Sequence, residues 1–140
     1  MTKTLLALAL LALAPFAQAE TAEPTPRTTI TSCRWAAGES IEVVGTIAVS
    51  RDDEGLRVLD GRLSFSGVLL GDPVCNSRRC VFKPAGEPSA ADTTYTLYPT
   101  YRKGSDRIVG MTMNQRSSII DANDHLGKCR AEKELPEDIY

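Results

Sequence analysis

The sequence predicts an all-β protein, either a small antiparallel barrel or a sandwich of five to six strands, held by two disulfides. Short runs of alternating apolar and polar residues recur at roughly ten-residue intervals, separated by turns rich in glycine, aspartate and proline. Beyond the N-terminal segment, no stretch repeats apolar residues with the period of a helix. Gly67 interrupts the most strand-like run, so an oligonucleotide/oligosaccharide-binding (OB) type of barrel is one form that this fold can take.

Residues 1–19 have the pattern of a secretory signal peptide. Lys3 is followed by an apolar run, Leu5–Ala14, and Ala17-Gln18-Ala19 has the small-x-small form of a cleavage site. The apolar run is shorter than the ~20 residues that a membrane span needs, so we expect no membrane anchor after cleavage. The sequence therefore predicts a periplasmic or secreted protein.

The rest of the chain divides into three parts. Residues 20–32 contain two prolines among threonines and lack apolar periodicity, which favours a flexible leader. A single β domain is expected over residues 33–130, followed by an acidic C-terminal tail over 131–140. The formal net charge of −2 argues against a nucleic-acid partner, because nucleic-acid binders usually carry a basic face.

Strands are expected wherever apolar residues alternate or β-formers gather. Asp60-Gly61 is typical of a two-residue hairpin turn, and residues 121–127 have the composition of a turn. The expected strands and short apolar segments are Ile41–Ser50, Leu56–Val58, Arg62–Leu70, Val81–Phe82, Thr93–Tyr101, Arg107–Met113 and Ile119–Ile120.

Four cysteines in an exported chain predict two disulfides. Three connectivities are possible, and we favour Cys75–Cys80 with Cys33–Cys129. The first pair flanks a four-residue loop between strand-like residues, where facing positions come within disulfide reach. The second closes a loop of about 100 residues, worth ~4–5 kcal/mol in the chain-entropy model. A zinc site is not expected, because the chain has no C-x-x-C motif and a single histidine.

The loop between the nearer pair of cysteines is the main candidate binding site. It carries Asn76, Ser77, Arg78 and Arg79. A disulfide lowers the entropy that such a loop loses on binding, and arginine is over-represented among the residues that dominate interface energies. Three tyrosines form a second candidate, with Tyr95 and Tyr101 on one face of their strand and Tyr98 on the other; they could line a groove.

Catalysis is not expected. His125 is the only histidine, and although Asp121, Asp124 and Ser117 lie near it in sequence, no G-x-S-x-G motif is present. We interpret His125 as a solvent-facing turn residue. Asp121, Asn123, His125 and Glu132 match four places of a calcium-binding loop, but Leu126 stands where that loop requires glycine. We therefore expect no metal and no cofactor.

Two functions remain open from the sequence. The first is an exported, non-enzymatic binding or inhibitory module that acts on an envelope or extracellular protein, such as a cell-wall enzyme. Size, disulfides, export and the missing catalytic set favour it. The alternative is a carrier of a small molecule or glycan, with the tyrosines lining the mouth of a barrel.

Overall fold

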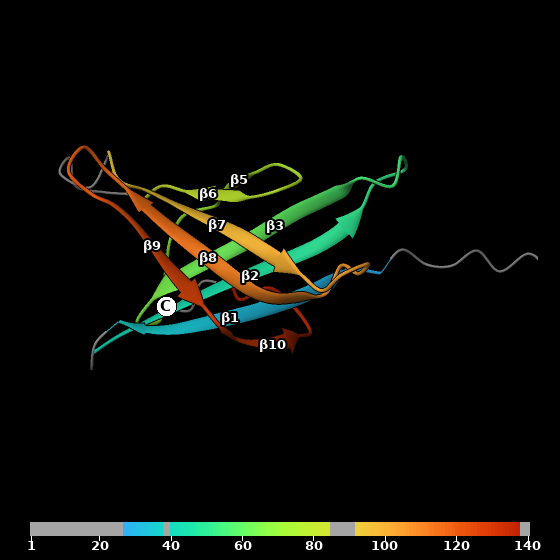
Figure 1. Ribbon diagram of the computed structural model, residues 1–140, viewed down its shortest axis with the longest axis horizontal. Coiled ribbons are helices and arrows are strands. Elements are labelled where there is room, and N and C mark those ends of the chain that lie inside the picture. Colours follow the sequence, from blue (N-terminus) through green and yellow to red (C-terminus); the bar gives the residue numbers. More distant parts are fainter. Residues whose placement is uncertain (1–26, 38–39, 85–91, 138–140) are drawn as a thin grey trace, which may run out of the picture.

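The computed structural model describes residues 27–37, 40–84 and 92–137, and they form two antiparallel five-stranded sheets (Figure 1). Within these ranges there is no helix, and so none long and apolar enough to cross a membrane. Sheet A has the order β10 (Lys128–Glu132), β1 (Thr29–Ala37), β2 (Ile41–Arg51), β3 (Arg57–Phe65), β4 (Val68–Leu69). Sheet B has the order β5 (Val74–Cys75), β6 (Cys80–Phe82), β7 (Thr94–Tyr101), β8 (Ile108–Arg116), β9 (Asp121–Leu126). The predicted signal peptide, 1–19, lies outside the described residues.

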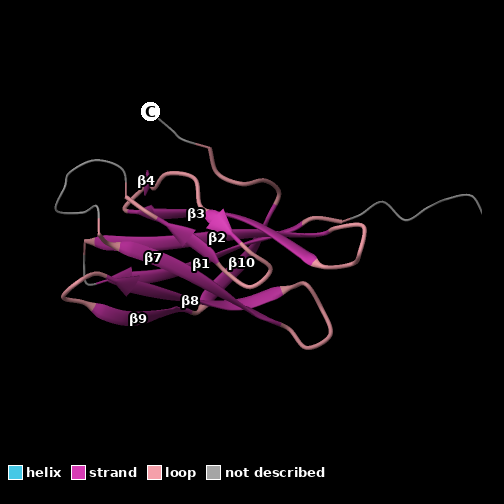
Figure 2. Ribbon diagram, turned by 90° about the horizontal axis from the view of Figure 1, so that it is seen from above, coloured by secondary structure: helices cyan, strands magenta, loops and turns pink. Residues whose placement is uncertain are grey.

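The two sheets pack as a sandwich and do not close into a barrel (Figure 2). The all-β prediction is confirmed, but the OB-type barrel is not formed. The chain passes from sheet B to sheet A at Gly127, between β9 and β10, while β4 and β5 at the other edge each pair with one neighbour only. Gly67 does not bend a long strand, because it forms a two-residue turn with Ser66, and both residues have positive φ (84° and 50°).

The structure has ten strands rather than five or six. Two of the additional strands, β4 and β5, are only two residues long, and three others, β1, β9 and β10, lie where the sequence pattern is weak. β1 begins at Thr29, inside the predicted leader, and lies between β2 and β10. β9 occupies the predicted turn, and β10 extends to Glu132, inside the predicted tail. β9 and β10 contain few apolar residues, so their pairing with neighbours stabilises them more than their own composition does.

Asp60-Gly61 does not form the predicted hairpin turn. Both residues lie inside β3, with Gly61 opposite Ile47 of β2. A Cβ atom at Gly61 would lie 3.0 Å from the carbonyl oxygen of Thr46, so glycine is needed there for close approach of two backbones. The turn between β2 and β3 lies at residues 52–55, where Oδ1 of Asp52 accepts hydrogen bonds from the backbone N–H groups of Glu54 (3.0 Å) and Leu56 (2.8 Å).

The core lies between the sheets and includes both disulfides. Cys33–Cys129 joins facing residues of β1 and β10, and Cys75–Cys80 joins facing residues of β5 and β6, so the predicted connectivity is confirmed. Trp35 is half-buried and packs against the cluster that contains Cys33. The largest buried side chains are Phe82, Ile47, Leu63, Leu97, Met111, Met113 and Leu126.

The C-terminal segment, residues 133–137, lies over the outer face of sheet A (Figure 2). Hydroxyl groups on that face are buried, and Ser32 and Thr46 form a hydrogen bond of 2.7 Å between their side chains. Glu134 and Pro136 line the same groove as these two residues. The acidic tail, as far as residue 137, therefore lies along the sheet.

Candidate functional site

The loop between β5 and β6 is held by one disulfide and three hydrogen bonds. The N–H group of Asn76 donates to the carbonyl oxygen of Arg79 (2.9 Å). The side-chain oxygen of Asn76 accepts from the N–H groups of Arg78 (2.8 Å) and Arg79 (3.0 Å). Asparagine forms such turns readily because its short side chain reaches the backbone two residues ahead. The loop therefore presents its side chains on a fixed backbone.

Both arginines of this loop are exposed, and within the described residues neither forms an ion pair. Nη1 of Arg79 donates a long hydrogen bond to the hydroxyl of Tyr98 (3.5 Å) on the outer face of β7. Arg79 and Tyr98, two predicted binding residues that are distant in sequence, therefore lie in contact. Ser77 is also exposed in the loop.

The other two predicted tyrosines do not share this surface. The Tyr95 ring packs at 4.9 Å from the ring of Phe65, and the guanidinium of Arg57 lies 3.7 Å from the centre of the Tyr101 ring. Both rings pack against the core. Because β7 places alternate side chains on opposite faces, Tyr98 alone of the three points outward. In the described part of the chain the two sheets do not close into a barrel, so these tyrosines do not line a barrel mouth.

Strand register places two further side chains in line with Tyr98 on the outer face of sheet B. Tyr98 of β7 pairs with Thr112 of β8, which in turn pairs with His125 of β9. Facing residues on neighbouring strands have Cβ atoms about 5 Å apart, so the three side chains form one row. Thr112 was missed from the sequence, where only the alternation within its own strand is visible.

His125 lies on a strand and not in the predicted turn. Its ring lies over two glycines, since Cβ atoms at Gly110 and Gly127 would lie 3.2 Å and 3.4 Å from it. Asp121 and Asn123, which match two places of a calcium-binding loop in sequence, are also extended on β9. Nδ2 of Asn114 donates to Asp121 and to Asn123, each at 2.9 Å. In the described residues no group of three metal-ligating side chains is present.

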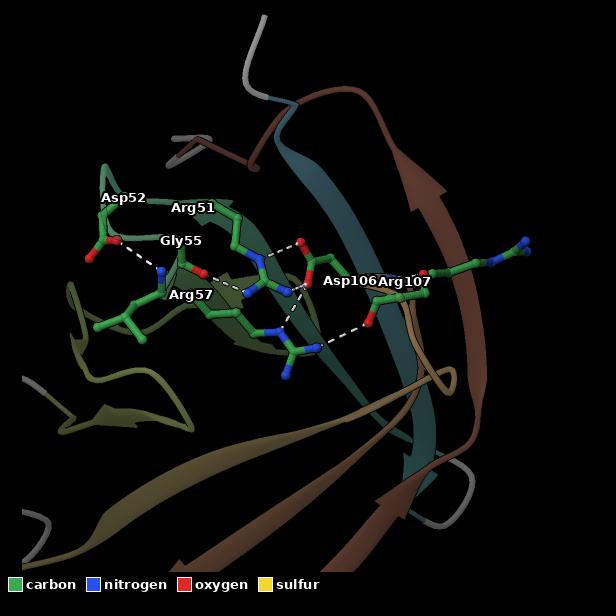
Figure 3. A network of polar contacts seen from close by, with 8 residues as sticks. Arg51, Asp52, Gly55, Arg57, Asp106 and Arg107 are labelled. Carbon is green, nitrogen blue, oxygen red and sulfur yellow. Dashed lines mark hydrogen bonds and ion pairs between the residues drawn. The ribbon is translucent and has the colours of Figure 1, made fainter. Parts of the chain in front are cut away.

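A separate polar network joins the two sheets at the end of β7 (Figure 3). Asp106, in the turn between β7 and β8, accepts hydrogen bonds from Arg51 Nε (3.0 Å), Arg51 Nη2 (2.6 Å) and Arg57 Nε (2.9 Å). Arg57 Nη2 also donates to the carbonyl oxygen of Ser105 (3.1 Å). We interpret this network as a clamp between the sheets, because its carboxylate and its guanidinium groups already satisfy one another.

Ionisation within this clamp is shifted from ordinary values. The hydrogen bonds from Arg51 are the main cause that lowers the pKa of Asp106, and the bonds from Arg57 add to it. The hydrogen bond to Asp106 raises the pKa of Arg51. Burial raises the pKa of Tyr101, whose hydroxyl is buried without a hydrogen-bond partner.

Comparison with known proteins adds no functional assignment: no family model matches the chain, and neither the curated proteins nor the solved structures contain a significant match.

Proposed function

We propose that the protein is an exported, non-enzymatic binding or inhibitory module whose partner is an acidic surface of an envelope or extracellular protein, such as a cell-wall enzyme. The observation that carries this proposal is the disulfide-held loop, with Arg78 and Arg79 exposed beside Tyr98. We call Val74, Arg78, Arg79 and Tyr98 the arginine surface.

The backbone order of the loop favours binding. A loop fixed by a disulfide and an asparagine-capped turn loses little conformational entropy when a partner binds. Arginine and tyrosine are the residue types that most often dominate interface energies, and arginine makes bidentate contacts with carboxylates. An acidic partner would therefore find donors already in place.

Apolar area beside the arginines supports a protein partner. Val74 is 80 % exposed on β5, directly opposite Val81, and Tyr98 is 39 % exposed. Apolar residues surrounded by charge are typical of the centre of a protein interface. This combination suits a folded protein surface better than a free inorganic anion.

Export is part of the same proposal. The N-terminal pattern of residues 1–19 favours cleavage and release into the periplasm or medium. The two disulfides are typical of an oxidising, extracellular-type compartment. Intact-mass measurement of the protein recovered from periplasm or medium should give a chain that begins at Glu20. Recovery of the full-length chain from the cytoplasm would contradict export.

The binding proposal is tested by charge reversal. The variant Arg78→Glu with Arg79→Glu should lose its partner in a pull-down from envelope extract, and the loss should shrink as salt screens the contact. The matched control is Arg116→Glu with Lys133→Glu: Arg116 faces Thr94 at the opposite end of β7, Lys133 follows β10, and both are exposed. Equal partner recovery by both double variants, with unchanged melting temperatures, would refute the arginine surface as the site.

A further inference from the structure

A groove of about 960 Å³ lies where the chain bends from sheet B into sheet A. It is bounded by the end of β1, the start of β2 and the Gly127 bend. Trp35, Ile41, His125 and Lys128 are among its lining residues. A volume of this size lies within the range of about 300–1,000 Å³ that is usual for small-molecule sites.

The groove has an aromatic and apolar wall, and part of it packs against the core. Trp35 is half-buried because part of its indole packs against the core, and its remaining surface lines the groove. Ile41 is 47 % exposed beside it. The His125 ring lies over Gly110 and Gly127, whose missing side chains leave room for it. A flat ligand would thus meet a preformed surface.

The rim of the groove is polar, and its described lining residues include two cations, Arg34 and Lys128, and one carboxylate, Glu42. Lys128 is exposed and forms no ion pair within the described part of the chain. Arg34 Nη1 bonds to Glu42 (3.3 Å), whereas Arg34 Nε is buried without a partner. Ser66 Oγ donates to the carbonyl oxygen of Ser40 (3.2 Å), so this hydroxyl keeps its lone pairs free as an acceptor.

We propose that this groove binds an acidic sugar, a pyranose ring that bears a carboxylate. The apolar face of the ring would lie on Trp35, the carboxylate would bond to Lys128, and the ring hydroxyls would bond to Glu42, Ser66 and His125. A purely apolar ligand would leave these polar groups unpaired in a desolvated site. A neutral sugar would leave Lys128 without a counter-charge.

The chain carries its own probe for this site, because Trp35 is its single tryptophan. Titration with a glucuronate-containing oligosaccharide should change the tryptophan emission saturably, and more weakly at high salt. A glucose oligosaccharide of equal length should bind about tenfold more weakly, the factor expected for one lost charge-assisted hydrogen bond. Titration with free glucuronate distinguishes two kinds of site. If the groove is a monosaccharide site, free glucuronate binds as well as the oligosaccharide; if it is a polymer site, free glucuronate binds more weakly.

Two variants test the assignment further. Lys128→Gln should weaken binding of the acidic oligosaccharide about tenfold by calorimetry, while the exposed control Lys103→Gln should leave it unchanged. Charge reversal at Arg78 and Arg79 should also leave sugar binding unchanged. The sugar site and the arginine surface are therefore tested independently of one another. Three results would overturn the proposal. In the first, neither acidic probe binds saturably by emission and calorimetry; in the second, the two lysine variants have equal effects. In the third, a peptide with a free carboxylate binds and the sugars do not.

Discussion

Removal of the Asp106 carboxylate tests whether the clamp holds the two sheets together. Asp106→Ala deletes the acceptor of three hydrogen bonds and leaves two guanidinium groups without their carboxylate. The side chains of Asp106 and Arg57 are 24 % and 29 % exposed, so most of their contact is shielded from water. Arg51 is 45 % exposed, and its pair is screened by solvent.

The expected cost follows from these exposures. A hydrogen bond to a charged group contributes ~1.5–3 kcal/mol when buried, and an exposed ion pair ~1 kcal/mol or less. Since only the Asp106–Arg57 contact is mostly buried, we expect the free energy of unfolding to fall by about 2 kcal/mol. For a domain of this size, that corresponds to a melting temperature lower by roughly 10 °C.

Urea unfolding at neutral pH, followed by circular dichroism, measures this loss. The exposed Asp72→Ala serves as the control and should stay within ~0.5 kcal/mol of the parent. A double-mutant cycle with Arg57→Met should give a coupling energy on the order of 1 kcal/mol for the contact pair. Equal melting temperatures for Asp106→Ala and Asp72→Ala would refute the clamp.

The pH dependence gives a second readout. Because the folded pKa of Asp106 is lowered, its stabilising effect is fully present above the ordinary pKa of 3.8 and is lost as pH falls through the lower folded value. The stability difference between parent and Asp106→Ala should therefore stay constant from neutral pH to about pH 5 and shrink below pH 4. A difference that grew on acidification would contradict the assignment.

Further predictions concern packing, disulfides and Tyr101. Gly61→Ala should lower the free energy of unfolding by ~1–3 kcal/mol, whereas Gly71→Ala, whose Cβ would lie 3.9 Å from its nearest neighbour, should be close to neutral by urea unfolding. Replacing Cys33–Cys129 by two serines should cost more stability than replacing Cys75–Cys80, because the disulfides span sequence separations of 96 and 5. In the chain-entropy model these separations correspond to about 4–5 and 2 kcal/mol. Denaturant midpoints of the two variants compare the losses, and the reverse order would refute that reasoning. Burial raises the pKa of Tyr101, so ionisation of this residue should destabilise the parent protein as pH rises beyond 10. Tyr101→Phe cannot ionise there, so in alkaline thermal melts it should lose less stability than the parent.

The sequence by itself determined the fold class and the covalent framework. The alternation in residues 41–50 predicted β2 almost to its bounds, because a half-buried strand needs apolar residues at every second position. Compartment and spacing were sufficient to choose Cys75–Cys80 and Cys33–Cys129 among three connectivities. The same local reading placed Tyr95 and Tyr101 on one face of β7 and Tyr98 on the other, since side chains alternate along any strand.

Local composition was misleading where a neighbouring strand decides the conformation. Asp60-Gly61 has the composition of a turn but continues β3, because it pairs with β2, and glycine at residue 61 allows the two backbones to approach without displacement. Residues 121–126 have few apolar side chains, yet they form β9 through pairing with β8. In both places the backbone hydrogen bonds to a distant segment outweigh local propensity.

Only the tertiary structure brought the candidate sites together. The contact of Arg79 with Tyr98, and the row from Tyr98 through Thr112 to His125, depend on the register of four strands. The Trp35 groove depends on the bend at Gly127, which sets the edges of the two sheets beside one another. A sequence pattern records which face of its own strand a residue occupies. Which strand becomes its neighbour is decided by the burial of apolar side chains across the whole domain, so these sites could not be predicted from local patterns.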